Sequence, residues 1–168
     1  MNRPAQVSAL ILMAVSASSC QQPRESSATD TANHVVQELA AAWSEHEPER
    51  LDELFTENGI YEDAPSGDTY TGPAEIKEYL RSVFSWAPDF TMKLTLTAVS
   101  GDTVFTEWTM EGTHVGPFDG FPATGNRFSV RGASVTVLEN GKVRRNTDYY
   151  DWATFATQLG AAITPPEM

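Results

Sequence analysis

Alternating apolar and polar side chains fill four segments in the C-terminal half of the chain, and this pattern constrains the fold more than any other feature. The segments are residues 92–100, 103–114, 127–138 and 142–150. A period of two is typical of β-strands that bury one face. The pairs Gly101-Asp102 and Asn140-Gly141 favour tight turns between neighbouring segments. The sequence therefore predicts a meander of antiparallel strands with one apolar face that other elements must cover.

The parity of each predicted strand indicates which side chains face the covered side. In residues 92–100 the even-numbered positions from Met92 to Ala98 share one face. In residues 127–138 the apolar positions change parity near Gly132, which predicts a β-bulge there. In residues 103–114 the even positions are predicted to point inward. They are Val104, Thr106, Trp108, Met110 and His114.

The N-terminal half shows helical spacing instead. Apolar residues from Val35 to Trp43 lie on one face of a helix that Asp30 or Thr31 can cap. A second short helix is expected over residues 48–55 and ends at Asn58-Gly59. Two more helices are expected, one from Pro73 until Pro88 and one over residues 152–159.

A short strand, residues 59–63, is predicted between the second and third helices, followed by a loop over residues 65–72. Alternation in this strand places Tyr61 and Asp63 on one face. The element order indicates an α+β fold. We expect a curved mixed or antiparallel sheet that wraps around the N-terminal helices and forms a cone with an internal cavity. A chain of 168 residues with 40% apolar residues suits one such domain, which we assign to residues 31–160.

The N-terminus has the layout of a secretory signal. Arg3 precedes an apolar stretch that is too short to span a membrane, and small residues lead to Cys20. We therefore predict a signal peptide of lipoprotein type over residues 1–19 and a lipidated Cys20. A flexible tether is expected over residues 20–30 and a disordered tail over residues 161–168. The protein is expected to be exported and lipid-anchored in the cell envelope, at the outer membrane or the periplasmic face if the cell is Gram-negative.

Charge and residue spacing exclude several classes of function. The net charge of −12 disfavours nucleic acid as a partner, because an acidic surface repels phosphate. The three histidines lack the spacing of metal ligands, so we predict no metal site.

Three segments resemble the SnoaL-like polyketide cyclases of the nuclear-transport-factor-like superfamily. They are LAAAWSEHEPERLDELFTENGIYED, EWTMEGTHVGPFDGFPATGNRFSVRGASV and GKVRRNTDYYDWATFATQLG. The resemblance implies cofactor-free proton transfer by an aspartate of the last strand. That role falls to Asp151, which precedes Gln158-Leu159-Gly160, with Asp148 as a second candidate. Asp151 could instead cap the helix that begins at Trp152.

The steroid isomerases of the same superfamily carry a Glu-Asp-Pro segment on the first strand. Residues 62–65 nearly repeat it, which makes Asp63 another candidate base or, alternatively, a turn residue. His114 is a candidate for proton transfer or for binding a polar group. Apolar walls around these groups are expected to bind a small hydrophobic molecule. The candidate wall residues are Trp43, Tyr61, Trp108, Met110, Phe118 and Phe121.

The resemblance leaves two functions open, a cofactor-free cyclase or isomerase and a non-catalytic binder of a ligand or partner. It also implies a homodimer through the open face of the sheet. The loop over residues 115–126 is the natural lid of the cavity.

Overall fold

The computed structural model describes residues 24–118, 120 and 122–161. Its helices are α1 (Arg24–Ser44), the 3₁₀ turn η1 (Pro48–Arg50), α2 (Leu51–Leu54), α3 (Gly72–Trp86) and α4 (Trp152–Leu159). Its strands are β1 (Phe55–Asp63), β2 (Asp68–Thr71), β3 (Thr91–Ser100), β4 (Thr103–Thr113), β5 (Arg127–Glu139) and β6 (Lys142–Tyr150). The predicted signal peptide, Cys20, Phe121 and residues 162–168 of the tail lie outside the described residues. Within the described part, no helix is both long and apolar enough to cross a membrane.

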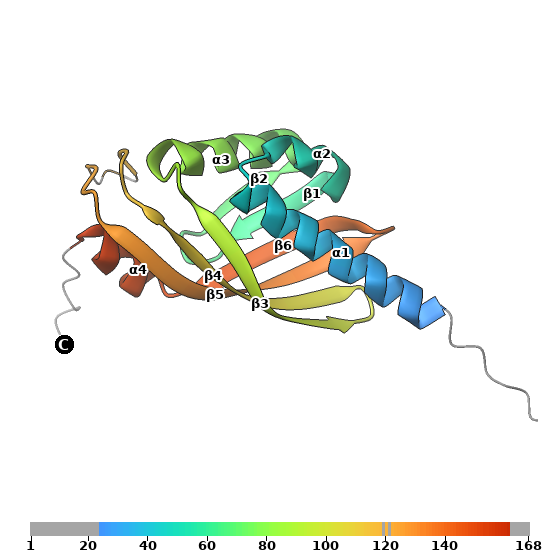
Figure 1. Cartoon of the computed structure of the whole chain (residues 1–168). Coiled ribbons are helices and arrows are strands. Elements are labelled where there is room, and N and C mark those ends of the chain that lie inside the picture. The colour runs from blue at the N-terminus through green and yellow to red at the C-terminus, as the bar shows by residue number, and fades with distance from the viewer. Residues whose placement is uncertain (1–23, 119, 121, 162–168) are drawn as a thin grey trace, which may run out of the picture.

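The strands form one mixed sheet in the order β2-β1-β6-β5-β4-β3. Neighbours are antiparallel except β1 and β6, which run parallel. Helix α1 lies across the sheet beside α2 and α3, and α4 lies at the other end of the molecule near β5 (Figure 1). The predicted α+β class and the mixed sheet packed against the N-terminal helix are confirmed.

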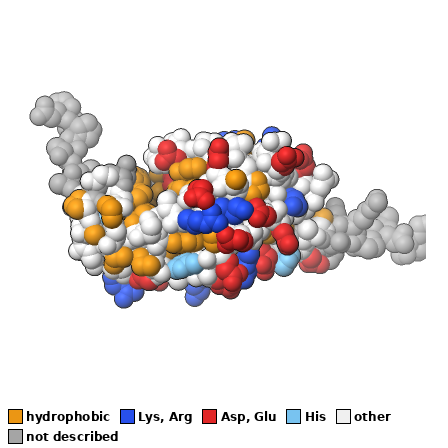
Figure 2. Space-filling view, turned by 90° about the horizontal axis from the view of Figure 1, so that it is seen from above, with side chains coloured by type: hydrophobic (Ala, Val, Ile, Leu, Met, Phe, Trp, Pro, Cys, Tyr) orange, Lys and Arg blue, Asp and Glu red, His pale blue; other side chains and the backbone are white. Residues whose placement is uncertain are grey.

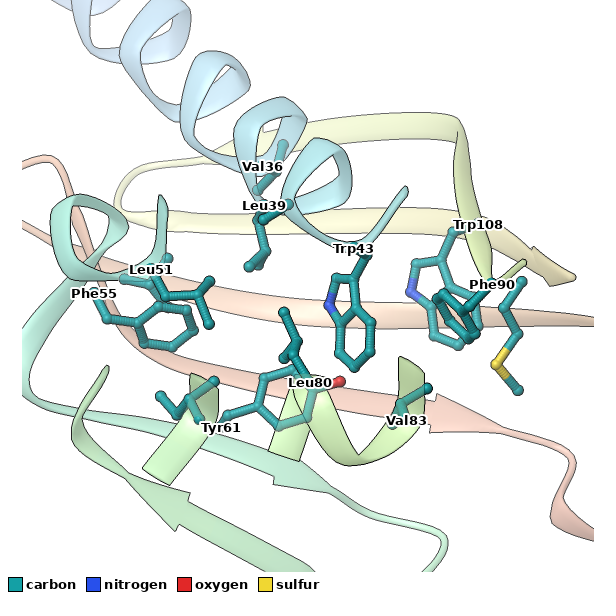
Figure 3. Packing of buried hydrophobic residues seen from close by; sticks show 14 of the residues in the cluster. Val36, Leu39, Trp43, Leu51, Phe55, Tyr61, Leu80, Val83, Phe90 and Trp108 are labelled. Atoms are coloured by element: carbon teal, nitrogen blue, oxygen red, sulfur yellow. The ribbon is translucent and has the colours of Figure 1, made fainter. Parts of the chain in front are cut away.

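The core lies between α1, α3 and the inner face of the sheet. Figure 3 shows Trp43 of α1 pointing down toward Tyr61 of β1 and Leu80 of α3, with Phe90 and Trp108 beside it. All five of these side chains are buried. Helix α3 forms where expected because apolar residues recur along one face, and Pro73 and Glu75 suit its first turn. The helix ends at Trp86, just before Pro88, as predicted.

The predicted faces of β4 are confirmed, since Val104, Thr106, Trp108 and Met110 are buried and their neighbours are not. The predicted bulge at Gly132 is wrong. Strand β5 pairs with β4 in unbroken register, and Gly132 lies opposite Trp108. A Cβ atom at this glycine would lie 2.2 Å from the indole ring. The glycine therefore makes room for Trp108 and does not mark a bulge.

The register of β3 corrects a second expectation. An irregularity between Leu94 and Leu96 shifts the alternation by one residue. Leu96 therefore pairs with Glu107 on the outer face and is 50% exposed, although Met92 and Leu94 remain on the inner side. A single irregular pair is enough to move half of a strand to the opposite face.

Three boundaries also differ from the sequence prediction. Helix α1 begins at Arg24, inside the segment expected to be a tether. Gly59 lies within β1 and does not end a helix. A Cβ atom at this position would come within 2.9 Å of the Val143 carbonyl oxygen on β6, which explains why a glycine occupies it. Residues 68–71 form β2, since they complete an antiparallel pair with β1 where a loop was expected. The predicted bounds of β6 and α4 are confirmed.

Candidate functional site

A cavity of about 560 Å³ lies between the inner face of the sheet and helices α1, α3 and α4. Its wall is largely aromatic, and it also holds three aspartates. None of the described residues that line it is Lys, Arg or His. The aromatic side chains are Trp43, Tyr61, Tyr70, Tyr79, Trp86, Phe90, Trp108, Phe118, Tyr150, Trp152 and Phe155, and the aspartates are Asp63, Asp68 and Asp148.

Asp148 lies on the inward-facing parity of β6, and only 4% of its surface is exposed. One carboxylate oxygen, Oδ1, accepts hydrogen bonds from Ser134 Oγ at 2.6 Å and Asn146 Nδ2 at 2.7 Å. The other, Oδ2, accepts from the hydroxyl of Tyr61. Burial raises the pKa of Asp148 to about 6, although the three donors oppose the shift. This carboxyl therefore changes its protonation state near neutral pH.

A buried network of polar side chains fixes the orientation of Asp148. Trp108 Nε1 donates to Ser134 Oγ at 2.7 Å, and Ser134 in turn donates to the carboxylate. Thr136 Oγ1 donates to Asn146 Oδ1 at 2.7 Å, which leaves the amide of Asn146 directed at Asp148. The network comes from β4, β5 and β6, whose registers place these residues on adjacent inward positions.

Asp63 ends β1 and lies beside Asp148 in the parallel register of β1 and β6. Its Oδ2 accepts from the hydroxyls of Tyr79 at 3.2 Å and Tyr150 at 3.0 Å. Its Oδ1 accepts from the backbone N–H of Ser66 at 3.3 Å. Burial raises the pKa of Asp63, and the hydrogen bonds from Tyr150, Ser66 and Tyr79 act in the opposite direction. Asp63 thus serves the turn before β2 and also lines the cavity.

Asp151 lies outside the lining of the cavity. It is exposed, and it caps α4 by accepting from the backbone N–H of Thr154 at 3.0 Å and from the Thr154 hydroxyl at 2.5 Å. These hydrogen bonds lower its pKa. The last strand ends at Tyr150, so the aspartate of that strand that faces the cavity is Asp148.

His114 is completely buried but is also absent from the lining of the cavity. Its Nδ1 lies 3.1 Å from Thr124 Oγ1 in the following loop. Its ring contacts Trp86 edge to face at 6.0 Å, and Trp86 itself lines the cavity. Within the described residues, Nε2 of His114 has no hydrogen-bond partner. The histidine therefore packs against the lining residue Trp86 and connects it to the loop that contains Thr124.

Five of the predicted wall residues line the cavity. They are Trp43, Tyr61, Trp108, Met110 and Phe118. Sequence reasoning missed Tyr79, Tyr150, Ser134 and Asn146 as site residues. Tyr79 lies among the apolar residues on the inner face of α3. Only the hydrogen bond from its hydroxyl to Asp63 distinguishes it from the other residues of that face. Tyr150 shares the parity of Asp148 on β6, and this signal was present in the sequence.

No group of three or more His, Cys, Asp or Glu side chains among the described residues could hold a metal ion. Within that part of the chain, the arrangement offers a desolvated carboxyl in an aromatic pocket with phenol and amide donors beside it. Such a carboxyl can take a proton from, or return one to, a bound molecule.

Comparison with known proteins gives consistent matches. The model of the family described as SnoaL-like polyketide cyclase matches residues 33–159. The aklanonic acid methyl ester cyclase DnrD of Streptomyces peucetius is 35% identical over 68 residues, which cover 40% of this chain and 47% of the cyclase. The match thus spans about half the length of that relative.

Two solved structures are similar over most of the chain. TsrD from Streptomyces laurentii has a TM-score of 0.72 and 26% identity, over 79% of this chain and 97% of TsrD. A protein with a ketosteroid isomerase-like fold from Catenulispora acidiphila DSM 44928, solved in complex with trimethylamine, has a TM-score of 0.67 and 26% identity. That similarity covers 78% of this chain and 97% of the other.

Proposed function

Since the chain belongs to the SnoaL-like polyketide cyclase family, we propose that its domain binds a small apolar carbonyl compound and moves a proton at the carbon beside the carbonyl, without a cofactor. The aromatic lining would supply the apolar contacts. The proposal covers both ring closure by an aldol step and isomerisation, because both begin with removal of that proton.

The observation that carries the proposal is the environment of Asp148. A general acid/base works best when its pKa lies near the operating pH. Burial brings the pKa of Asp148 to about 6, and the carboxyl lines the cavity where a substrate would lie. Asp148 is therefore assigned as the acid/base. Asp63 lines the same cavity, where it accepts hydrogen bonds from the hydroxyls of Tyr79 and Tyr150.

Exchange of carbon-bound hydrogen for deuterium tests this function directly. The purified protein would be incubated in D₂O with polyketide methyl esters, which the relative from Streptomyces peucetius suggests, and with steroid ketones. NMR would follow loss of the proton signal beside the carbonyl. Asp148→Asn should abolish the exchange, whereas Asp151→Asn should retain it, because Asp151 is exposed and caps α4. Equal exchange by the wild type and Asp148→Asn would exclude the assigned role.

A non-catalytic binding protein is the second candidate, and one observation favours it. Both oxygens of Asp148 already accept hydrogen bonds from protein donors, so the carboxyl is satisfied without a substrate. Under this alternative the same compounds would raise the thermal stability of the protein, but no compound would exchange its protons.

We further propose that the domain is exported and anchored through a lipid on Cys20, on the evidence of residues 1–20 alone. Mass spectrometry of the N-terminal peptide from the native cell tests this. A diacylated or triacylated Cys20 as the first residue is expected, and Cys20→Ser should release the protein from the membrane fraction. An unmodified cysteine would contradict the proposal.

A further inference from the structure

We propose that the ligand of the cavity carries a positively charged amine, protonated or quaternary, on an apolar body. The inference rests on the proposed function, since it names the chemical class of the molecule that binds in the same cavity. It is carried by the arrangement of rings and carboxyls and by the charge balance of the lining.

The rings of the cavity form two groups, each held together by close ring contacts. In one group, Trp43 lies 5.1–6.1 Å from three other rings by centroid distance. In the other, Phe155 lies 5.6–6.1 Å from four rings. The partners are Tyr61, Tyr79 and Phe90 for Trp43, and Trp86, Phe118, Tyr150 and Trp152 for Phe155. Ring faces attract cations, and the attraction is strongest where water is excluded.

A carboxyl joins the two groups. Oδ2 of Asp63 accepts from Tyr79 of the first group and from Tyr150 of the second. Asp148 accepts from Tyr61 of the first group and lies beside Asp63 in the register of β1 and β6. A ligand between the two groups would therefore contact aromatic rings and approach at least one carboxyl.

Among the described residues, the negative charge of this lining has no basic partner. Three aspartates line the cavity, and none of the described lining residues is Lys, Arg or His. Several acidic groups on the surface of the helices are paired with basic side chains. Arg81 contacts Glu49 and Glu78 at 2.5 Å, and Lys77 contacts Asp52 at 2.7 Å. Basic and acidic side chains accordingly lie interleaved over the middle of the helical face (Figure 2).

Charges removed from water are normally paired, because an unpaired buried charge is costly. In this cavity neutral hydroxyl and amide donors stabilise Asp63 and Asp148 only in part, and burial still raises the pKa of both. A ligand cation would supply the missing counter-charge. An anionic ligand would add repulsion, and a neutral ligand would leave the imbalance as it is.

A pair of probes of nearly identical shape isolates the charge. Choline carries a trimethylammonium group, and 3,3-dimethylbutan-1-ol replaces its nitrogen with carbon. Isothermal titration of the full-length protein at pH 8 should show choline binding roughly ten-fold more tightly or better, as expected for one desolvated cation–π contact. Equal affinities, tighter binding of the alcohol, or no binding of choline would overturn the inference.

Substitutions of single aspartates test which carboxylate causes the preference for choline. Asp63→Asn should weaken choline binding roughly ten-fold and leave the alcohol within about two-fold, because it removes one charge but keeps the shape. Asp102→Asn, in the exposed turn between β3 and β4, is the matched control and should change neither affinity. If Asp63→Asn also loses the alcohol, Asp63→Glu decides, because it restores the charge and should keep the preference for choline. Loss of that preference in Asp63→Glu would overturn the assignment.

The deuterium-exchange experiment separates this inference from the proposed function. Exchange that depends on Asp148, without a preference for choline, would refute the cationic ligand and leave the acid/base function intact. A preference for choline without any exchange would support the ligand class and favour the non-catalytic protein.

Discussion

The change Asp148→Asn should make the stability of the fold less sensitive to pH between pH 4 and pH 8. Burial raises the pKa of Asp148 from 3.8 to about 6. Between these values the folded state holds a proton that the unfolded state has lost, so native stability falls as the pH rises through this window. The shift of about two units corresponds to a loss of about 3 kcal/mol that is complete above about pH 6. Asparagine keeps the shape and carries no charge at any of these pH values.

Urea unfolding of the wild type and Asp148→Asn at pH 4 and pH 8 measures this effect. Relative to the wild type, the variant should gain about 2 kcal/mol of unfolding free energy on going from pH 4 to pH 8, because part of the total loss already occurs below pH 4. Taking the difference between the two pH values cancels the contribution of those altered hydrogen bonds that change the unfolding free energy equally at both. A variant whose unfolding free energy stays parallel to that of the wild type would refute the argument that Asp148 is desolvated.

Asp151→Asn is the matched control because it removes a nearby carboxylate whose pKa lies below the tested pH range. Hydrogen bonds from Thr154 lower the pKa of Asp151, so its ionised form stabilises the fold above its ordinary pKa. That contribution is lost as the pH falls through the lowered pKa. Asparagine also caps helices well, which preserves α4. Because that lowered pKa lies below 3.8, Asp151→Asn should follow the wild type between pH 4 and pH 8, whereas Asp148→Asn should gain stability at pH 8 relative to pH 4.

Three further predictions follow from other contacts. Tyr61→Phe removes a donor to the Asp148 carboxylate and should raise the pKa of Asp148 by roughly one unit; a midpoint of the pH profile of deuterium exchange that matches the wild type would contradict it. Gly132→Ala places a Cβ against Trp108 and should cost roughly 1–3 kcal/mol in urea unfolding; a cost below about 0.5 kcal/mol would show that the indole ring moves freely. The homodimer implied by the family resemblance should form through the outer face of the sheet, where Phe105 and Tyr149 are 45% and 50% exposed. In analytical ultracentrifugation Phe105→Glu should therefore sediment as a monomer and the wild type as a dimer. A monomeric wild type would contradict the predicted dimer.

Strand parity was a reliable guide on β1 and β4, but it failed on β3 beyond the irregularity between Leu94 and Leu96. It placed Tyr61 and Asp63 on one face of β1, and both are buried. It also placed Trp108 and Met110 inward on β4. These positions were predictable because a register error of one residue would expose the whole apolar set to water.

The apolar parity was also misleading on β5, where part of the inner face is polar. On β5 the inward positions change from Phe128 and Val130 to Ser134 and Thr136, while Val135 occupies the outward parity. A change of apolar parity without a change of register looks like a bulge in the sequence. Only the pairing with β4 shows that β5 continues straight through Gly132.

Asp148 and Asp151 show the same limit at the level of the site. The family resemblance pointed to an aspartate of the last strand, and two aspartates stood at the end of that strand in the sequence. Which one faces the cavity depends on where the strand ends, and such boundaries are the least certain part of a sequence prediction. The strand ends at Tyr150, so Asp148 keeps the inward parity and Asp151 caps the next helix.

The polar patch on the inner face also bears on function. Ser134, Thr136, Asn146 and Asp148 lie on neighbouring inward positions of β5 and β6, where apolar residues would pack at less cost. Hydrogen bonds connect all four, and the connections converge on one oxygen of Asp148. Stability alone gives no reason to bury such a chain of groups. The need to hold one carboxyl in a fixed orientation beside the cavity does explain the buried polar groups, because a proton acceptor works only in the right orientation.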